Sequence, residues 1–408
     1  MDSGLIRAIA QNNPNLTIKK VRYYIFLRDV VALAFTAFGG PQVHIALFIE
    51  RLVEKRGYLS EQELMELNAL CQILPGPTST QTITAIGFRV GGIPLAYLTL
   101  FIWCIPAVTI MILLALGFTF LKSQRVFIDI THYIQPMAVG FIAYAAFKIS
   151  RAVIKSRSGI LVMIISAIIS SFYASPFLFP ILIVLGGTAT ALKYKKQPIV
   201  EKNEPLKIKW DGFLLWAGIL ITGGVLATFT NFAPIKLFEN FYRNGSLIFG
   251  GGQVLIPLLY TEFVEFKAFL SSSEFLSGYG FAQAVPGPVF SFSAFIGSLS
   301  MREYGVIGKI LGGLIAAAGI FLPGTFLIFF VYRFWEALKR YRIVRASLEG
   351  ITAASSGMVA AAALLLFLPL PMVWYNPSIV LGTFAVLQFT RIPAPFIVLG
   401  GLILGLVF

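Results

Sequence analysis

A run of hydroxyl and amide side chains, Thr78-Ser79-Thr80-Gln81, directly follows a Pro-Gly-Pro triplet at residues 75–77. Proline removes a backbone donor and disfavours helix in the residue before it, so one helix must end at the triplet and another must begin after it. The new helix starts with unpartnered backbone N–H groups and about half a positive charge. Because N–H groups and hydroxyls are both donors, the sequence predicts an anion site at Gly76 and at Thr78, Ser79, Thr80 and Gln81.

A second glycine-rich break precedes the first, and both breaks recur later in the chain. Phe38-Gly-Gly-Pro-Gln42 matches Phe249-Gly-Gly-Gly-Gln253 at an offset of 211 residues, and the Pro-Gly-Pro triplet recurs at 286–288 with the same offset. Glycine lets a backbone approach an ion closely. The duplication therefore adds eight candidate binding residues, which are Gly39, Gly40, Gln42, Gly251, Gly252, Gln253, Gly287 and Ser291. Since the second copy has fewer hydroxyls, we expect the first half to hold most of the anion.

Two helix N-termini supply only about one positive charge, so a doubly charged anion needs a further source. Arg89 is a candidate, but it lies twelve residues past Pro77, about 18 Å along a helix, and anchoring at the membrane surface is the favoured interpretation. His44 has the chemistry to couple protons, with plain packing as its alternative. Glu66 is predicted to be interfacial, with coupling-ion binding as the alternative.

The composition places the chain in a membrane. Of 408 residues, 57% are hydrophobic and only 12% are charged, which leaves too few charges to cover a soluble surface. The net charge of +14 is explained by cytoplasmic loops without any nucleic-acid partner. Cys71 and Cys104 lie in apolar runs, so neither a disulfide framework, a metal site nor a cofactor is expected. The first twenty residues have no apolar core typical of a cleaved signal peptide, so we expect the first hydrophobic segment to be retained.

The apolar segments predict an all-α, polytopic transmembrane bundle. About thirteen segments are expected, at 28–49, 63–89, 93–121, 131–152, 158–173, 177–192, 211–230, 240–260, 274–299, 306–332, 346–368, 375–390 and 394–408. With a cytoplasmic N-terminus, 23 Lys and Arg residues fall inside and 9 outside.

The same segments divide the chain into four parts. These are a cytoplasmic segment (1–27), a first repeat (28–192), a basic linker with a connecting helix (193–230) and a second repeat (231–408). Seven segments separate the starts of the two copies. An odd number inverts the second copy, which is the plan of many secondary transporters.

Four spaced motifs together resemble the chromate ion transporter family in its long, two-domain form. They are FGGPQVHIALF (38–48), LPGPTSTQ (74–81), FGGGQVLIPLL (249–259) and QAVPGPVFSFSAFIG (283–297), and the resemblance spans residues 25–408. It implies an inner-membrane, secondary transporter that expels chromate and has no ATP-binding domain. No Walker-type motif occurs here. It also implies that the glycine, proline and glutamine positions of the paired motifs, with His44, Thr78 and Ser79, belong to the transport site.

Several hypotheses about the function are compatible with the sequence. We expect a transporter that works by alternating access, with the two halves rocking about the broken helices. Sulfate shares the charge and tetrahedral shape of chromate, so another oxyanion is the main alternative substrate. A membrane-embedded enzyme is a remote alternative, because the chain has two histidines and no metal-protease or triad pattern. The interrupted helices count against a purely structural membrane module, which would have no need of them. The direction of transport, the coupling ion and the oligomeric state do not follow from the sequence.

Overall fold

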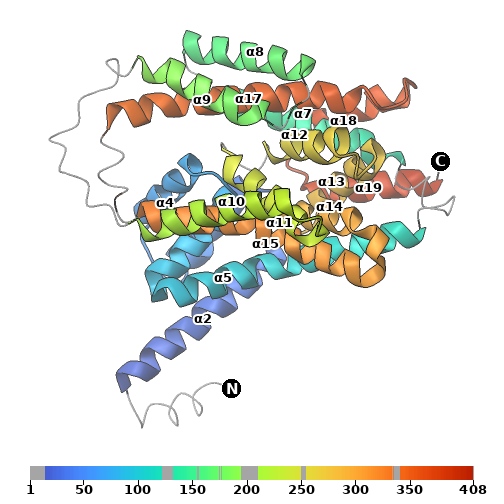
Figure 1. Ribbon diagram of the computed structural model, residues 1–408. Helices are drawn as coiled ribbons and strands as arrows, with labels where there is room; N and C mark the ends of the chain where they lie inside the picture. The colour runs from blue at the N-terminus through green and yellow to red at the C-terminus, as the bar shows by residue number, and fades with distance from the viewer. Residues whose placement is uncertain are drawn as a thin grey trace.

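The structure is a computed structural model that describes residues 14–121, 132–153, 156–173, 175, 177–193, 210–249, 254–332, 334 and 341–407. Within these ranges all regular structure is helical, which confirms the all-α prediction (Figure 1). The first repeat contains α2 (Pro14–Thr36), α3 (Pro41–Phe48), α4 (Glu61–Ile73), α5 (Thr78–Leu121), α7 (Ile134–Val153), α8 (Arg157–Phe172) and α9 (Leu178–Ala191). α10 (Asp211–Phe229) connects the repeats.

The second repeat follows the same order of elements. It contains α11 (Ala233–Leu247), α12 (Leu255–Tyr260), α13 (Ser272–Ala284), α14 (Phe292–Ser300), α15 (Gly305–Tyr332), α17 (Arg342–Phe367), α18 (Tyr375–Phe389) and α19 (Ala394–Val407). Short turns of other helix types extend three of these helices: η1 (Ile49–Glu54) continues α3, η3 (Thr261–Phe266) continues α12, and η4 (Val289–Ser291) leads into α14.

The helices break where the sequence predicts. α2 ends before Gly39, α4 ends before Pro75, and α13 ends before Pro286. At the two Pro-Gly-Pro triplets the central residues, Gly76 and Gly287, have φ angles of +117° and +99°. The fourth break falls at 250–253, outside the described residues, between the end of α11 and the start of α12.

At each break in the first repeat the chain folds back on itself. Asp29 on α2 pairs with Arg51 on η1 (3.0 Å) and with Arg56 just beyond it (2.8 Å). Glu63, at the start of α4, pairs with Arg89, which lies twelve residues after the triplet on α5. Residues on either side of a break can meet in this way only if the two helices form a hairpin. We call α2 with α3–η1 hairpin A, and α4 with the first part of α5, up to its kink at Gly91–Gly92, hairpin B.

The second repeat forms the same two hairpins. Hairpin C (α11 with α12–η3) is joined by an ion pair between Arg243 and Glu262 (3.1 Å). Hairpin D (α13 with η4–α14) is joined by Glu274 and Arg302 (2.9 Å). α4 and α13 begin alike, because Ser60 and Ser271 each form a capping box with a glutamate three residues on.

The hairpins correct the predicted path of four segments. The prediction that 28–49, 63–89, 240–260 and 274–299 each cross the membrane is wrong, since each of them turns at its motif and returns. Apolar length cannot separate one crossing helix from two half-length helices. Two of the corrected segments lie between the starts of the two copies, so five of the seven predicted crossings are left. That number is still odd, so the corrected path also predicts inverted halves.

The re-entrant path has a direct test by cysteine labelling. We expect Lys55→Cys to react with a membrane-impermeant maleimide from the same side as the N-terminus, and Ala268→Cys from the opposite side. Straight crossings would reverse both results. Both positions are exposed, whereas the native Cys71 and Cys104 are buried and should stay silent, which the parent protein controls.

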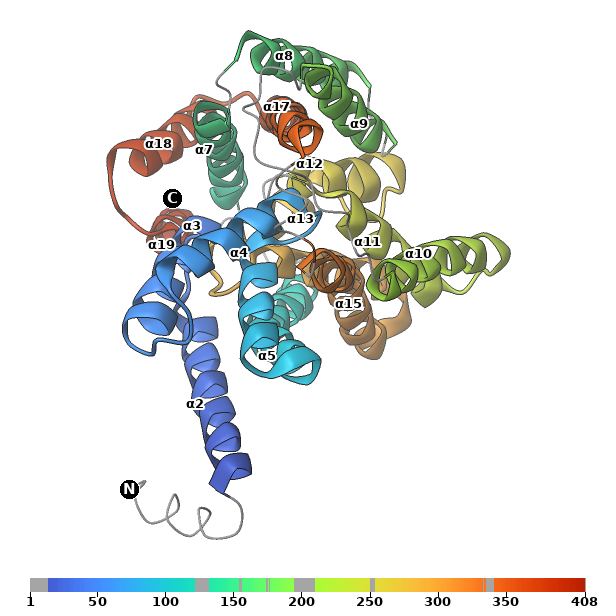
Figure 2. The ribbon, with the colours of Figure 1, turned by 90° about the vertical axis from the view of Figure 1, so that its left-hand side faces the viewer.

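The helices pack into two bundles that each draw on both repeats. α17 packs against α7, α8 and α9, and α18 packs against α7; we call these five helices the α17 bundle. The four hairpins pack with the rest of α5, α15 and α10 to form the hairpin bundle. Figures 1 and 2 show the two bundles as separate layers, with α12, α13 and α19 near their boundary. Each structural layer therefore contains helices from both sequence repeats.

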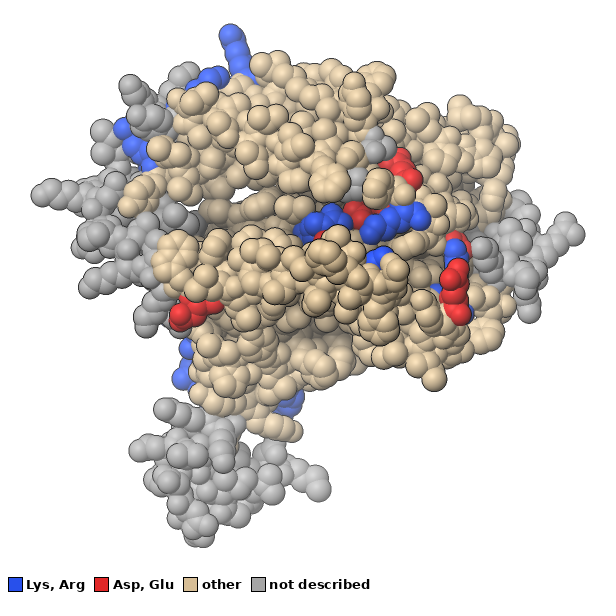
Figure 3. All heavy atoms as spheres, in the orientation of Figure 1, with Lys and Arg blue, Asp and Glu red and all other residues tan. Residues whose placement is uncertain are grey.

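The surface agrees with a membrane environment. Four helices in the described part of the chain are long and apolar enough to span a bilayer: α5, α10, α17 and the stretch Arg302–Tyr332 that includes α15. Large apolar side chains lie on the surface: Phe172, Phe229 and Phe389 are 80%, 83% and 82% exposed. Figure 3 shows few charged side chains on the visible face, apart from a group in the groove between the layers. The chain is a multi-pass membrane protein.

Candidate functional site

The hairpin tips of the two repeats interlock through a reciprocal pair of hydrogen bonds. The Gly76 N–H at the tip of hairpin B donates to the Ile248 carbonyl at the tip of hairpin C (2.8 Å). The Gly287 N–H at the tip of hairpin D donates to the Ala37 carbonyl at the tip of hairpin A (2.8 Å). Each partner in the second bond lies 211 residues from its equivalent in the first, so the two halves are related by a pseudo-two-fold axis through the tips. The prolines around each glycine fix the turn that presents this N–H.

The hydroxyl cluster lies at the tip of hairpin B, in the first turn of α5. Thr78, Ser79, Thr80 and Gln81 are each at most 5% exposed. His44 on α3 is fully buried and its Nδ1 lies 2.9 Å from Ser79 Oγ, which joins hairpin A to hairpin B. Among the described residues, His44 Nε2 has no hydrogen-bond partner. The structure therefore brings His44 into the predicted site.

Gln81 ties the same tip to the second repeat. Its Nε2 donates to the Pro75 carbonyl (2.8 Å) and to the Gly324 carbonyl on α15 (3.2 Å). The side-chain oxygen of Gln81 is buried and has no hydrogen-bond partner within the part of the chain that the structure describes. A buried, unpartnered polar atom costs free energy unless something binds it, so this oxygen and His44 Nε2 are open positions at the tip.

Trp103, on the distal part of α5, is a site residue that the sequence analysis missed. Its Nε1 donates to Thr80 Oγ1 (3.2 Å). Its ring packs edge-on against His44 and Phe48, with centroid distances of 5.2 and 5.5 Å. The sequence offers no signal for this role, because Trp103 is one of five tryptophans and lies in an uninterrupted apolar run.

Two predicted residues lie away from the tips. Arg89 pairs with Glu63 at the open end of hairpin B, and both side chains are 36% exposed. Glu66 accepts a hydrogen bond from Gln62 one turn away on α4 (3.2 Å), near the start of that helix. The structure brings neither charge to the hydroxyl cluster.

The remaining predicted residues divide by hairpin. On hairpin A, Gly39 and Gln42 are exposed and Gly40 is half-buried. On hairpin D, Gly287 and Ser291 are buried, with Ser291 in η4 just past the tip. Gly251, Gly252 and Gln253 lie outside the described residues.

The recorded polar partners of Ser79, Thr80 and Gln81 in the described part of the chain carry no carboxylate or ammonium group. Helix dipoles predict a positive potential at this tip, from the N-termini of α5 and of α3, which begins at Pro41. Among the described residues, no three His, Cys, Asp or Glu side chains gather to hold a metal ion. The chemistry available here is hydrogen-bond donation to an anion, with no charged acceptor that would repel it.

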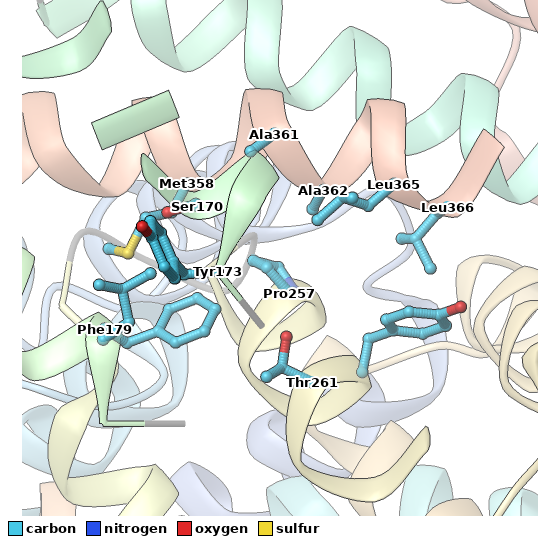
Figure 4. Close-up of a pocket in the computed structure, with 12 residues that line it drawn as sticks. Ser170, Tyr173, Phe179, Pro257, Thr261, Met358, Ala361, Ala362, Leu365 and Leu366 are labelled. Carbon is cyan, nitrogen blue, oxygen red and sulfur yellow. The ribbon is translucent and has the colours of Figure 1, made fainter. Parts of the chain in front are cut away.

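A separate small cavity of about 10 Å³ lies where the two bundles face each other, between α8, α9, α12 and α17. Figure 4 shows Tyr173, Phe179, Pro257, Thr261 and Met358 around it. It shares no lining residue with the hydroxyl cluster, whose side chains are closed off from solvent.

Interrupted helices whose tips meet inside an inverted-repeat bundle are typical of membrane transporters, and the buried donors at these tips fit that class. The comparison with known families agrees. The chain belongs to the chromate transporter family, whose family model matches residues 25–192 and again residues 235–406, once for each repeat.

Individual relatives are distant but match along most of the chain. A probable chromate transport protein of Synechococcus elongatus is 25% identical over 97% of both chains. The chromate transport protein of Cupriavidus metallidurans is 25% identical over 97% of this chain and 94% of its own. An uncharacterized transporter of Methanocaldococcus jannaschii is 24% identical over 81% and 80%. No solved structure matches the chain.

Proposed function

We propose that this protein is a secondary transporter that exports chromate, a tetrahedral oxyanion, across the cytoplasmic membrane. The observation that carries the proposal is the buried donor cluster at the tip of hairpin B, where tips from both repeats meet. Ser79 and Thr80 with the α5 N-terminus supply the donors, and His44 adds a ring nitrogen. The Gln81 amide holds the tip in place through the Pro75 and Gly324 carbonyls. The substrate name rests on relatives that are themselves named chromate transport proteins.

Alternating access then requires two bodies that move against each other. The expectation that the two sequence halves rock does not suit this fold, because the Gly76–Ile248 and Gly287–Ala37 bonds tie the halves together at the site. We assign the motion to the hairpin bundle moving against the α17 bundle. Each contains helices of both repeats, and the cavity shown in Figure 4 lies at their boundary. In this scheme the structure represents an occluded state, because the hydroxyl cluster at the tip of hairpin B is closed off from solvent.

We place the N-terminus in the cytoplasm. The re-entrant path moves Arg51, Lys55 and Arg56 to the N-terminal side and Lys267 to the opposite side, so the division of basic residues changes from 23 and 9 to 25 and 7. The stronger bias supports this orientation under the positive-inside rule.

Removing single donors tests the site. We expect Ser79→Ala and Thr80→Ala each to raise the KM for chromate roughly tenfold or more in inside-out vesicles, since a hydrogen bond to a charged group contributes about 1.5–3 kcal/mol. Thr119→Ala is the matched control, because Thr119 lies on the same helix and its hydroxyl donates to the Ala115 carbonyl of that helix (2.8 Å).

Parental kinetics in both tip variants would reject this site. Competition by sulfate in the same vesicles decides the alternative substrate: sulfate that competes as strongly as chromate, and is itself transported, identifies a general oxyanion transporter.

A further inference from the structure

Trp103 lies at a junction of three hairpins. Its indole bonds Thr80 of hairpin B, and its ring packs on His44 and Phe48 of hairpin A. Its backbone lies beneath the tip of hairpin D, where a Cβ built on Gly287 would stand 3.7 Å from the Trp103 carbonyl oxygen. The side chain is fully buried.

The chemistry of the two side chains determines which is the donor and which the acceptor in the Trp103–Thr80 hydrogen bond. An indole N–H can only donate, so Thr80 Oγ1 must accept. The hydroxyl proton of Thr80 is therefore left to donate in another direction. The neighbouring hydroxyls behave differently: Thr82 and Thr84 donate their protons to the carbonyls of Thr78 (2.8 Å) and Thr80 (2.7 Å), four residues back on α5.

A fully deprotonated oxyanion accepts hydrogen bonds and donates none, so a hydroxyl serves it only when its proton points at the ligand. We propose that Trp103 is a positioning residue that holds Thr80 as a donor to the bound oxyanion. The inference rests on the proposed function and adds a residue outside the family motifs. The buried ring alone would also fit a packing role, so the test must separate the N–H from the ring.

Trp103→Phe makes that separation, because it keeps an aromatic ring against His44 and Phe48 and removes the N–H donor. It also removes part of the ring volume, which the Trp216→Phe control shares. We expect the KM for chromate to rise roughly fivefold to tenfold while kcat stays within about twofold of the parent. Trp216→Phe is the matched control: Trp216 on the peripheral helix α10 also donates through Nε1, to Ser246 Oγ (3.0 Å). It should leave the KM unchanged.

Thr80→Val supplies a second, independent variant with nearly the same shape. If Trp103 acts through Thr80, the double variant should have about the KM of Thr80→Val alone, because the two changes remove one shared interaction. An unchanged KM in Trp103→Phe, effects that multiply in the double variant, or an equal rise in Trp216→Phe would each overturn the inference. A parent protein that moves neither chromate nor sulfate would instead overturn the proposed function.

Discussion

Gly76→Ala is expected to reduce chromate transport at least tenfold while the protein still inserts into the membrane. The φ angle of Gly76 is +117°, a conformation that a residue with a Cβ rarely adopts. An added Cβ would stand 3.1 Å from Gln81 Nε2 and 3.3 Å from the Gly324 Cα. Relief of this crowding must move Gln81, and with it the link to α15, or shift the Gly76 N–H away from Ile248. Initial rates in vesicles, normalised to the amount of inserted protein, measure the effect.

Gly57→Ala separates backbone strain from crowding. Gly57 also has a positive φ of +60°, but a Cβ there would meet no atom within 4 Å. It should cost about 1–2 kcal/mol of local strain and leave transport near the parental rate. Equal losses in both variants would mean that strain anywhere in the hairpins is enough. A fully active Gly76→Ala would show that the interlocked tip is not needed.

Gly350→Ala is expected to destabilise the whole protein. Gly350 on α17 faces Gly186 on α9, and a Cβ there would overlap the Gly186 carbonyl oxygen. The Gly350 N–H also donates to Thr190 Oγ1 (3.0 Å), so a shift of α17 would break this bond as well. Overpacking of this kind costs about 1–3 kcal/mol or more. We expect a clear fall in the thermal unfolding temperature of the purified protein and lower yield in the membrane.

Gly382→Ala provides the comparison for that variant. Gly382 lies within α18, and a Cβ there would meet nothing within 4 Å. Alanine favours helix over glycine by up to about 1 kcal/mol, so this variant should match or exceed the parent in stability. If Gly350→Ala unfolds at the same temperature as Gly382→Ala, α9 and α17 do not pack as closely as the structure indicates.

The sequence alone determined the class of protein, the duplication and the four break points. Composition predicts a membrane environment, because a chain of 408 residues that is 57% hydrophobic cannot bury all of its apolar side chains in its own core. Proline and glycine end helices through local backbone geometry, so the motif positions predict the breaks without any knowledge of neighbours. The prediction of an anion site at Thr78 to Gln81 follows from the same local argument.

The path of the chain after each break, and the residues that meet there, depend on how the helices pack in three dimensions. A broken helix can continue across the bilayer or turn back, and the difference lies in pairs such as Glu63 with Arg89, 26 residues apart. His44 reaches Ser79 across 35 residues and Trp103 reaches Thr80 across 23. The same holds for the bond of Gly76 to Ile248. Such contacts depend on how whole helices pack, and packing is set by the summed fit of many side chains that no local pattern encodes.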